Sequence, residues 1–291
     1  MIQIDENKKI TVSFGGTCKL GCAHCYTNTT NFVHQEVLSV DNIIDILNSE
    51  RGKFSTICIS GDTDCFLEPF KSLELIKEII KNFFDVNIMF TTRLIPPKEI
   101  VEELIKVGNI CNRRKQLFIP CISVITYNYP NKIENGLLVP STIERLNFFQ
   151  TLISAGLPCF LTLRPTFPFE IVPLNEIIQI LDYVKVTPAA VLGEVLLLDK
   201  SGILEKRLGI DVEQKECPES KLTFIYQPLE WKKMYCNKEH SSIKKECVRR
   251  GLPFFMRSMS AIKYLKKIYT YNGIINHQPQ YFGDEICNIF P

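Results

Sequence analysis

The chain is organised around the stretch Gly15-Gly16-Thr17-Cys18-Lys19-Leu20-Gly21-Cys22-Ala23-His24-Cys25-Tyr26. Its three cysteines stand at relative positions 0, 4 and 7 in one glycine-punctuated loop, so three thiolates can converge on one inorganic centre. A cubane iron–sulfur cluster held by only three cysteines keeps one iron without a protein ligand and open to a cofactor. The spacing therefore predicts a 4Fe-4S cluster bound by Cys18, Cys22 and Cys25.

Two other uses of these cysteines stay open. Structural zinc takes four protein ligands, usually from two separated Cys-x-x-Cys pairs, and a zinc site here would need His24 as its fourth ligand between crowded neighbours. The cysteines could also be buried core residues or disulfide partners, although one disulfide would leave the third cysteine unpaired. Both remain alternatives to the cluster.

The composition predicts a globular protein with one large domain and a smaller extension. The chain has 291 residues, of which 45% are hydrophobic, and it has no apolar run near the 18 residues that a membrane span needs. The first residues lack the basic and apolar regions of a signal peptide, so we expect a cytoplasmic location and no membrane partner. Twelve cysteines in such a chain indicate reduced thiols and metal chemistry.

Apolar runs and helical patterns alternate along the first two thirds of the chain. Strands are expected at residues 10–14, 56–60, 86–90, 117–125, 158–163 and 190–198, with helices near 40–47, 69–84, 141–155 and 174–183 and one opened by Pro96-Pro97. Six such units predict an α/β fold, a partial (β/α)6 TIM-type barrel over residues 1–199. Residues 200–291 are expected to form a mostly irregular and helical extension that covers the barrel mouth.

The predicted strands all end in polar residues. In a β/α barrel the active site lies at the carboxyl ends of the strands. Arginines at the third and fifth ends and acids at the second and sixth suit a zwitterionic cofactor, because guanidinium binds carboxylate and carboxylate binds hydroxyl or amine. The ends are Cys18 to Tyr26, Ser60-Gly61-Asp62-Thr63-Asp64, Thr91-Thr92-Arg93, Ser123 to Tyr127, Arg164-Pro165-Thr166 and Glu194.

The form CKLGCAHCY is similar to the signature of the radical S-adenosylmethionine (SAM) superfamily. The resemblance implies that SAM chelates the open iron, that an electron from the cluster cleaves its sulfonium, and that a 5′-deoxyadenosyl radical takes hydrogen from a substrate. Over roughly residues 11–168 the order of segments resembles the spore photoproduct lyase branch. Gly61-Asp62-Thr63-Asp64 and the tract from Ser123 to Arg164 carry this closer likeness.

The resemblance assigns roles to individual residues. It makes Cys18, Cys22 and Cys25 the cluster ligands and places around SAM Tyr26, Thr63, Asp64, Arg93, Ser123 and Arg164. Thr63 and Asp64 could instead cap the next helix. We interpret Glu134 and Arg145 as a structural ion pair or solvated charges, and His24 as a neighbour of the cluster or a solvated side chain.

A thiol near the second strand end donates hydrogen in the lyases that this chain resembles. The matching position here falls at or next to Gly61, so Cys65 is the candidate, with Cys58 as a second nearby thiol. Cys65, together with Tyr26, is therefore predicted to act in catalysis. A small buried hydrophobe is the alternative role for Cys65.

The C-terminal third combines basic and aromatic residues. Residues 230–267 hold eleven Lys or Arg against three Glu, with aromatic rings interleaved, a composition that suits nucleic acid or, equally, a solvated helix face. The spacing of Cys217, Cys236, Cys247 and Cys287 matches no cluster pattern, so a second metal centre stays an open question.

Together these patterns predict a radical SAM enzyme of lyase or oxidoreductase type that uses a 4Fe-4S cluster and SAM. Its substrate is expected to be a nucleic acid or nucleotide, or alternatively a peptide or small metabolite. An external reductant such as flavodoxin or ferredoxin would supply the electron. A non-catalytic iron–sulfur or zinc module that binds nucleic acid is the rival hypothesis. The polar strand ends at Thr63, Asp64, Arg93 and Ser123 favour the enzyme, because a metal module has no need of them.

Overall fold

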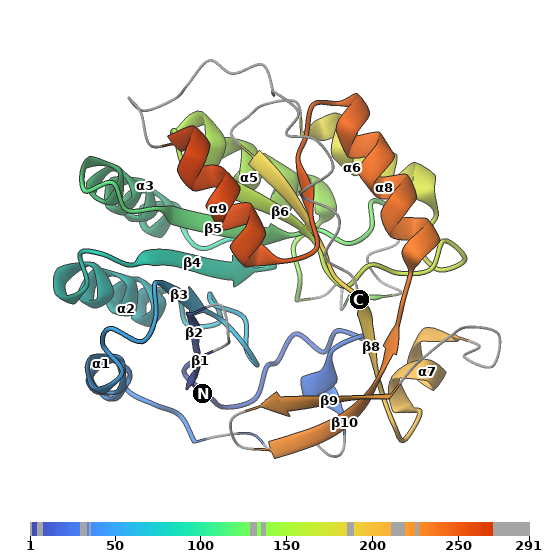
Figure 1. Cartoon of the computed structure of the whole chain (residues 1–291), viewed down its shortest axis with the longest axis horizontal. Helices are drawn as coiled ribbons and strands as arrows, with labels where there is room; N and C mark the ends of the chain where they lie inside the picture. The colour runs from blue at the N-terminus through green and yellow to red at the C-terminus, as the bar shows by residue number, and fades with distance from the viewer. Residues whose placement is uncertain are drawn as a thin grey trace.

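A computed structural model of the chain describes residues 2–4, 8–29, 34, 36–128, 133–134, 138–184, 189–210, 219–224 and 227–269. Its main sheet has eight strands in the order β1-β2-β3-β4-β5-β6-β7-β11 (Figure 1). Only β1 runs antiparallel to its neighbour. The sheet does not close, so the predicted partial α/β barrel is confirmed. The strands are β1 (Ile2–Ile4), β2 (Lys9–Val12), β3 (Thr56–Ile59), β4 (Asn87–Thr92), β5 (Phe118–Ser123), β6 (Cys159–Leu163), β7 (Ala189–Gly193) and β11 (Phe254–Phe255).

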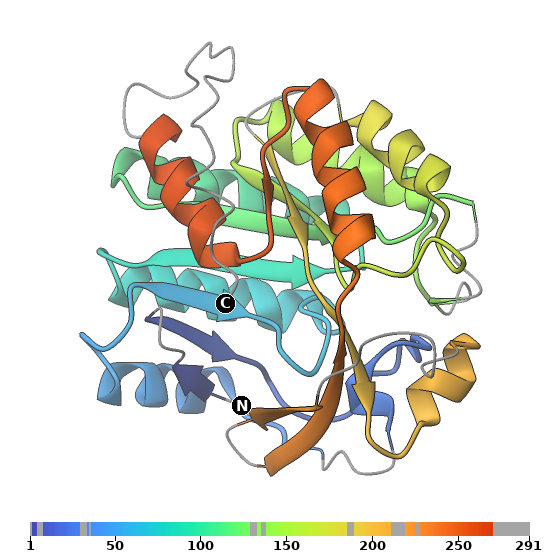
Figure 2. The ribbon, with the colours of Figure 1, turned by 45° about the vertical axis from the view of Figure 1, so that its right-hand side comes forward.

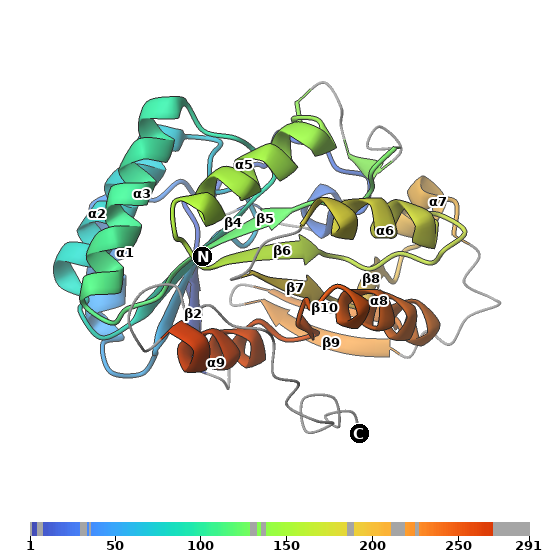
Figure 3. The same cartoon turned by 90° about the horizontal axis from the view of Figure 1, so that it is seen from above.

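Helices that connect successive strands cover the outer face of this sheet. They are α1 (Val40–Ser49), α2 (Pro69–Asn82), α3 (Lys98–Arg113), α5 (Thr142–Ser154) and α6 (Leu174–Tyr183), and Figure 3 shows them on one side of the strands. Because side chains alternate along a strand, Ile57 and Ile59 pack against these helices while Cys58 points to the inner face. The helices begin where the sequence predicts, and α5 has a capping box formed by Ser141 and Glu144.

The inner face of the sheet is apolar towards the amino ends of its strands. Its buried residues include Cys58, Met89, Ile119, Cys121, Phe160 and Leu192. Phe255 of β11 and residues of α9 (Ser258–Tyr269), among them Leu265, complete this cluster. Figure 3 shows α9 on the side of the sheet opposite α1, α2 and α3. The C-terminal region therefore fills this half of the barrel interior.

The C-terminal region differs from the sequence-based expectation in two ways. The single strand predicted at 190–198 is split, because the chain turns after Gly193 and β8 (Leu196–Asp199) joins a separate antiparallel sheet in the order β8-β10-β9. Besides the helices α7 (Ile203–Leu208), α8 (Asn237–Arg249) and α9, this region contributes three strands, β9 (Glu219–Phe224), β10 (Gln227–Met234) and β11. Their partners are distant in sequence, and β11 has only two residues, so no local pattern indicates them.

Close packing explains the glycine at the end of β7. A Cβ atom on Gly193 would lie 2.6 Å from Cζ of Phe254 and 3.1 Å from Sδ of Met256. Glycine thus lets β11 approach β7. In the part of the chain that the structure describes, no helix is both long enough and apolar enough to cross a membrane.

The substitution Leu265→Ala is expected to lower the free energy of unfolding by about 3 kcal/mol, because it removes a fully buried side chain from the cluster between α9 and the sheet. Urea denaturation followed by circular dichroism measures the change. Lys263→Ala, an exposed position on the same helix, is the control and should cost less than about 0.5 kcal/mol. Equal effects of the two substitutions would contradict the packing role of α9.

Candidate active site

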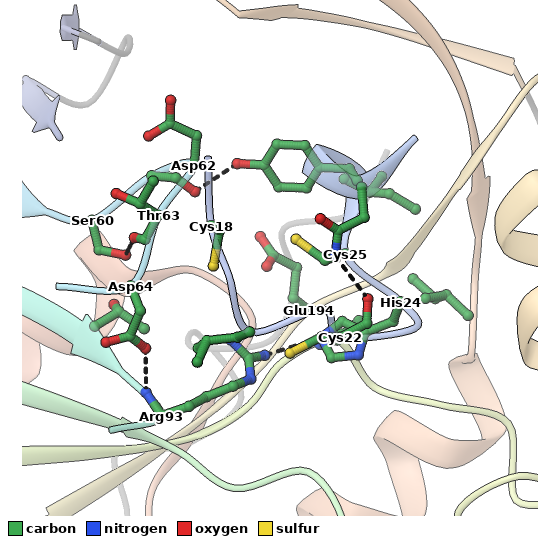
Figure 4. A pocket seen from close by; sticks show the side chains of 18 of the residues that line it. Cys18, Cys22, His24, Cys25, Ser60, Asp62, Thr63, Asp64, Arg93 and Glu194 are labelled. Carbon is green, nitrogen blue, oxygen red and sulfur yellow. Dashed lines mark hydrogen bonds between the residues drawn. The ribbon is translucent and has the colours of Figure 1, made fainter. Parts of the chain in front are cut away.

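The cysteine loop follows β2 and ends in a short 3-10 helix, η1 (Tyr26–Asn28). Gly15 and Gly16 have φ angles of 76° and 75°, which side-chain-bearing residues rarely adopt, so these glycines let the loop leave the strand. Cys18, Cys22 and Cys25 are free thiols and line one cavity (Figure 4). The disulfide alternative thus finds no support within the described residues.

This cavity has a volume of about 170 Å³ and lies at the carboxyl ends of β2, β3, β4 and β7. The three cysteines share it with polar side chains from the ends of the neighbouring strands. They are Ser60, Asp62, Thr63, Asp64, Thr91, Arg93 and Glu194, together with His24, Tyr26 and Asn28 from the cysteine loop. The structure therefore brings together the three predicted cluster ligands and four of the residues predicted around SAM: Tyr26, Thr63, Asp64 and Arg93.

Asp64 ties the end of β3 to the end of β4. Its carboxylate accepts hydrogen bonds from the Thr92 hydroxyl at 2.7 Å, the Arg93 backbone N–H at 2.6 Å and the Phe66 backbone N–H at 3.0 Å. Burial raises the pKa of this carboxyl, and the three donors act in the opposite direction. Three donors occupy the Asp64 carboxylate, so its visible role is to fix the backbone that presents Thr63 and Arg93. The Thr63 hydroxyl makes no hydrogen bond within the described residues.

Arg93 places a positive charge between the cysteine loop and the strand ends. Its Nε donates to Oε1 of Glu134 at 3.0 Å, and its Nη2 donates to Nε2 of His24 at 3.0 Å. Burial acts to lower the pKa of Arg93, but the anionic groups around it outweigh burial and raise this pKa, so the guanidinium stays charged. Its Nη1 makes no hydrogen bond to any described residue. Arg93 thus keeps one donor for a ligand in the cavity.

His24 is a buried, neutral ring. Burial and the charge of Arg93 lower its pKa well below 6.5. Its Nε2 accepts the hydrogen bond from Arg93, and its ring packs edge-on against Phe167 at 5.7 Å. Because Nε2 is turned to Arg93, the zinc alternative loses this nitrogen as a ligand. Among the described residues, no three His, Cys, Asp or Glu side chains converge on a site for a single metal ion.

A buried ion-pair network lies behind the cavity. Glu134 accepts from Nη1 of Arg145 at 3.0 Å and also pairs with its Nη2 at 2.5 Å, while Arg145 donates to the Ser123 carbonyl at 2.7 Å. Both side chains are fully buried. Glu134 and Arg145 thus form a buried ion pair, and the alternative interpretation as solvated charges is wrong. The contact of Glu134 with Arg93 could not be seen in the sequence, because these residues lie 41 positions apart.

The charges around the loop also act on the cysteine thiols. Burial raises the pKa of Cys22 to about 11; Arg93 works against this increase, while Glu134 adds to it. Burial raises the pKa of Cys18 as well. Arg93 is therefore a cationic group that acts on Cys22 and favours its thiolate form.

Three predicted site residues do not line the cavity. Ser123 is buried, and its Oγ has no hydrogen-bond partner among the described residues. Arg164 donates from Nε to the Gly193 carbonyl at 3.1 Å. Cys65 is buried in the apolar core, which raises its thiol pKa well above 9.0. Their predicted roles remain predictions.

The small C-terminal sheet approaches the cysteine loop. Trp231 of β10 meets the ring of Tyr26 edge-on at 6.0 Å, and the Tyr26 hydroxyl donates to the Gly61 carbonyl at 2.7 Å. Figure 2 shows this sheet beside the segment that carries the loop. Of the four C-terminal cysteines, Cys236 and Cys247 are buried and form no disulfide, whereas Cys217 and Cys287 lie outside the described residues.

Acid is expected to destabilise the metal-free protein through His24. The unfolded chain takes up a proton near pH 6.5 while the folded ring stays neutral, so stability is present above pH 6.5 and falls by about 1.4 kcal/mol per pH unit below it. Urea unfolding at pH 7, 6 and 5 measures this slope. The variant His24→Gln keeps an acceptor for Arg93 and should have a flatter pH dependence; an unchanged slope would show that His24 titrates freely in the folded state.

Comparison with known proteins relates the chain to one superfamily and to several solved structures. Residues 12–117 match the family model of the radical SAM superfamily. No curated protein sequence matches the chain. Among solved structures, a double mutant of spore photoproduct lyase with bound AdoMet and dinucleoside spore photoproduct is 14% identical with a TM-score of 0.60, the match covering 88% of this chain and 79% of that one.

A single-site mutant of spore photoproduct lyase gives a TM-score of 0.58 at 14% identity, with coverages of 86% and 75%. A radical SAM methyltransferase from Sphaerobacter thermophilus gives 0.55 at 11% identity, with coverages of 88% and 68%. At such identities the structural likeness establishes the fold. Residues 12–117 thus match the radical SAM superfamily, and the chain shares the fold of these solved radical SAM structures.

Proposed function

We propose that Cys18, Cys22 and Cys25 bind a 4Fe-4S cluster and that SAM binds beside it in the cavity. The single observation that carries this proposal is that three free thiols of one loop open into the same cavity as the polar ends of β3 and β4. The donor set fits the group, since thiolates are the ligands of such clusters and three leave one iron for SAM. When bound, the cluster and SAM supply an electron and a cleavable sulfonium, and hence a radical that abstracts hydrogen.

The residues of the chain would hold and orient this cofactor. Arg93 would bind the methionine carboxylate through its free Nη1. The Thr63 hydroxyl is available to the ribose, and Asp64 would act by fixing the backbone around both residues. Tyr26, held by the Gly61 carbonyl, would form the wall of the pocket. Ser123 and Arg164 do not line this cavity, so they would contact only a part of the ligand that extends beyond it.

The substrate is proposed to be a nucleic acid or nucleotide, with a peptide or small metabolite as the alternative. The cations of residues 230–267 support the first choice. The positions of these cations support the alternative. Two of them are neutralised, because Lys232 pairs with Glu205 and Arg250 pairs with Asp182. Others lie on α9, which packs at the amino ends of the strands, away from the cavity. The contact of Trp231 with Tyr26 supports a division in which residues 200–291 cover the barrel mouth of residues 1–199. Flavodoxin or ferredoxin would deliver the electron.

Anaerobic reconstitution tests the proposed chemistry. The protein is loaded with iron and sulfide, treated with dithionite and SAM, and analysed for 5′-deoxyadenosine by chromatography. We expect product from the wild type and none from Cys22→Ala. Cluster loading without SAM cleavage would favour the non-catalytic binding module, and co-purified zinc without iron loading would refute the proposal.

A further inference from the structure

The carboxylate of Glu134 joins three parts of the molecule that are far apart in sequence. It binds Arg93 at the end of β4 and Arg145 on α5, and the Arg93 side chain continues to His24 in the cysteine loop. Beside it, the carbonyl of Ile133 accepts a hydrogen bond from the backbone N–H of Ala23 at 2.9 Å. Ile133 is thus bonded directly to the loop between Cys22 and Cys25, and Glu134 is joined to it through Arg93.

The network contains two guanidinium groups and one carboxylate. Two nitrogens of Arg145 donate to the two carboxylate oxygens of Glu134, a bidentate geometry that arginine–carboxylate pairs favour. Arg145 has no exposed side-chain surface and does not line the cavity. Arg145, which lies on the side of Glu134 away from the cavity, therefore neutralises the charge of Glu134. Without Arg145, the ion pair with Glu134 would neutralise Arg93. With Arg145 present, Arg93 keeps its positive charge on the cavity side.

Stability alone does not account for such a network. Two buried guanidinium groups and a buried carboxylate lose their hydration, and replacing buried ion pairs by apolar residues is often neutral or stabilising. Nε of Arg145 also lacks a hydrogen-bond partner among the described residues, which adds to the cost. A charge arrangement that costs free energy and points at a cysteine loop indicates an electrostatic role.

We propose that Glu134 and Arg145 are positioning residues of the cluster site: Glu134 holds Arg93 against the cysteine loop, and Arg145 offsets the charge of Glu134, so that these three residues together keep one net positive charge. This inference rests on the proposed cluster. Reduction potentials of iron–sulfur clusters depend on the net charge and hydrogen bonds around them. The network should therefore set the potential at which the cluster accepts its electron, without touching the cluster or SAM.

The test is the midpoint potential of the reconstituted cluster, measured by redox titration with electron paramagnetic resonance. Glu134→Gln keeps the shape but removes a negative charge, so its potential should shift to more positive values. Arg145→Met removes a positive charge, and its potential should shift to more negative values. Arg145→Lys keeps the charge and should stay closer to the wild type than Arg145→Met. Glu144→Gln, at the exposed position before Arg145 on α5, is the matched control and should not move it.

Opposite shifts are the signature of a charge effect, because a merely structural defect would lower cluster content or shift both variants in one direction. Shifts of the same sign, or equal potentials in loaded wild type and variants, would overturn the inference and leave the proposed function standing. If Arg145→Met fails to load, the comparison of Arg145→Lys and Glu134→Gln with the wild type decides. A wild type that loads no cluster would overturn the proposed function and this inference together.

Discussion

Arg93→Met should weaken the binding of SAM to the cluster-loaded protein by about 100-fold, because a hydrogen bond from a cation to a carboxylate contributes on the order of 1.5–3 kcal/mol. Methionine fills a similar space but offers neither charge nor donor. Glu134 would still be paired with Arg145, so the buried carboxylate does not become isolated. The substitution should therefore lower the affinity for SAM and leave the stability of the fold largely unchanged.

Equilibrium dialysis under anaerobic conditions measures this change. Decarboxylated S-adenosylmethionine is the matched probe, because it lacks the group that Arg93 is proposed to bind, and its affinity should differ little between wild type and variant. Arg93→Lys keeps the charge and should recover part of the affinity for SAM. If both compounds lose affinity equally, Arg93 acts by shaping the loop through His24 and not by contacting the carboxylate.

Asp64→Ala is expected to lower the free energy of unfolding by about 3–5 kcal/mol. It leaves three donors without their acceptor, the Thr92 hydroxyl and the backbone N–H groups of Phe66 and Arg93, and each unsatisfied buried donor costs about 1–3 kcal/mol. Water entering the space that the carboxylate leaves reduces the sum below the largest total. The same change frees the backbone at Arg93 and should weaken SAM binding as well.

Urea denaturation of the metal-free protein measures the stability of this variant. Asp45→Ala, an exposed position on α1, serves as the control and should cost less than about 0.5 kcal/mol. Asp64→Asn is a second variant: it keeps one acceptor but turns an N–H₂ group toward one of the donors, so it should lie between the wild type and Asp64→Ala. A cost for Asp64→Ala no larger than that of the control would show that the three hydrogen bonds are not made in solution.

The six strands of the barrel could be predicted because parallel strands covered on both faces appear as short apolar runs. The runs around Ile57, Ile88 and Ile122 correspond to β3, β4 and β5. The strands β8, β10 and β11 could not be predicted, because their pairing depends on residues distant in sequence and not on a local apolar run. β8 and β10 pair across 32 to 38 positions, and Phe254 and Phe255 form a strand where Gly193 lets them approach β7.

The candidate site divides in the same way. Cysteine spacing and the polar residues after each strand could be recognised locally, and the parallel sheet brings strand ends together at one edge. Asp64 fixes the backbone at the end of β4, whereas the Thr63 hydroxyl is left for a ligand. This difference could not be foreseen, since it depends on which of the two side chains turns toward β4. Cys65 points into the core because it is one residue beyond Asp64 in a turn, where strand alternation no longer fixes direction.

The packing of α9 inside the barrel has a consequence for how the protein is made. Residues 12–117, which carry the cysteine loop, leave the ribosome long before Phe255 and Leu265, so the apolar inner face at Met89 and Phe160 stays uncovered until translation nears residue 269. Hydrophobic surface exposed in this way promotes aggregation. A truncated chain that ends before β11 would keep that surface permanently, so fragments limited to the cysteine-bearing segment are expected to be insoluble, and full-length chains are the material in which iron loading should be studied.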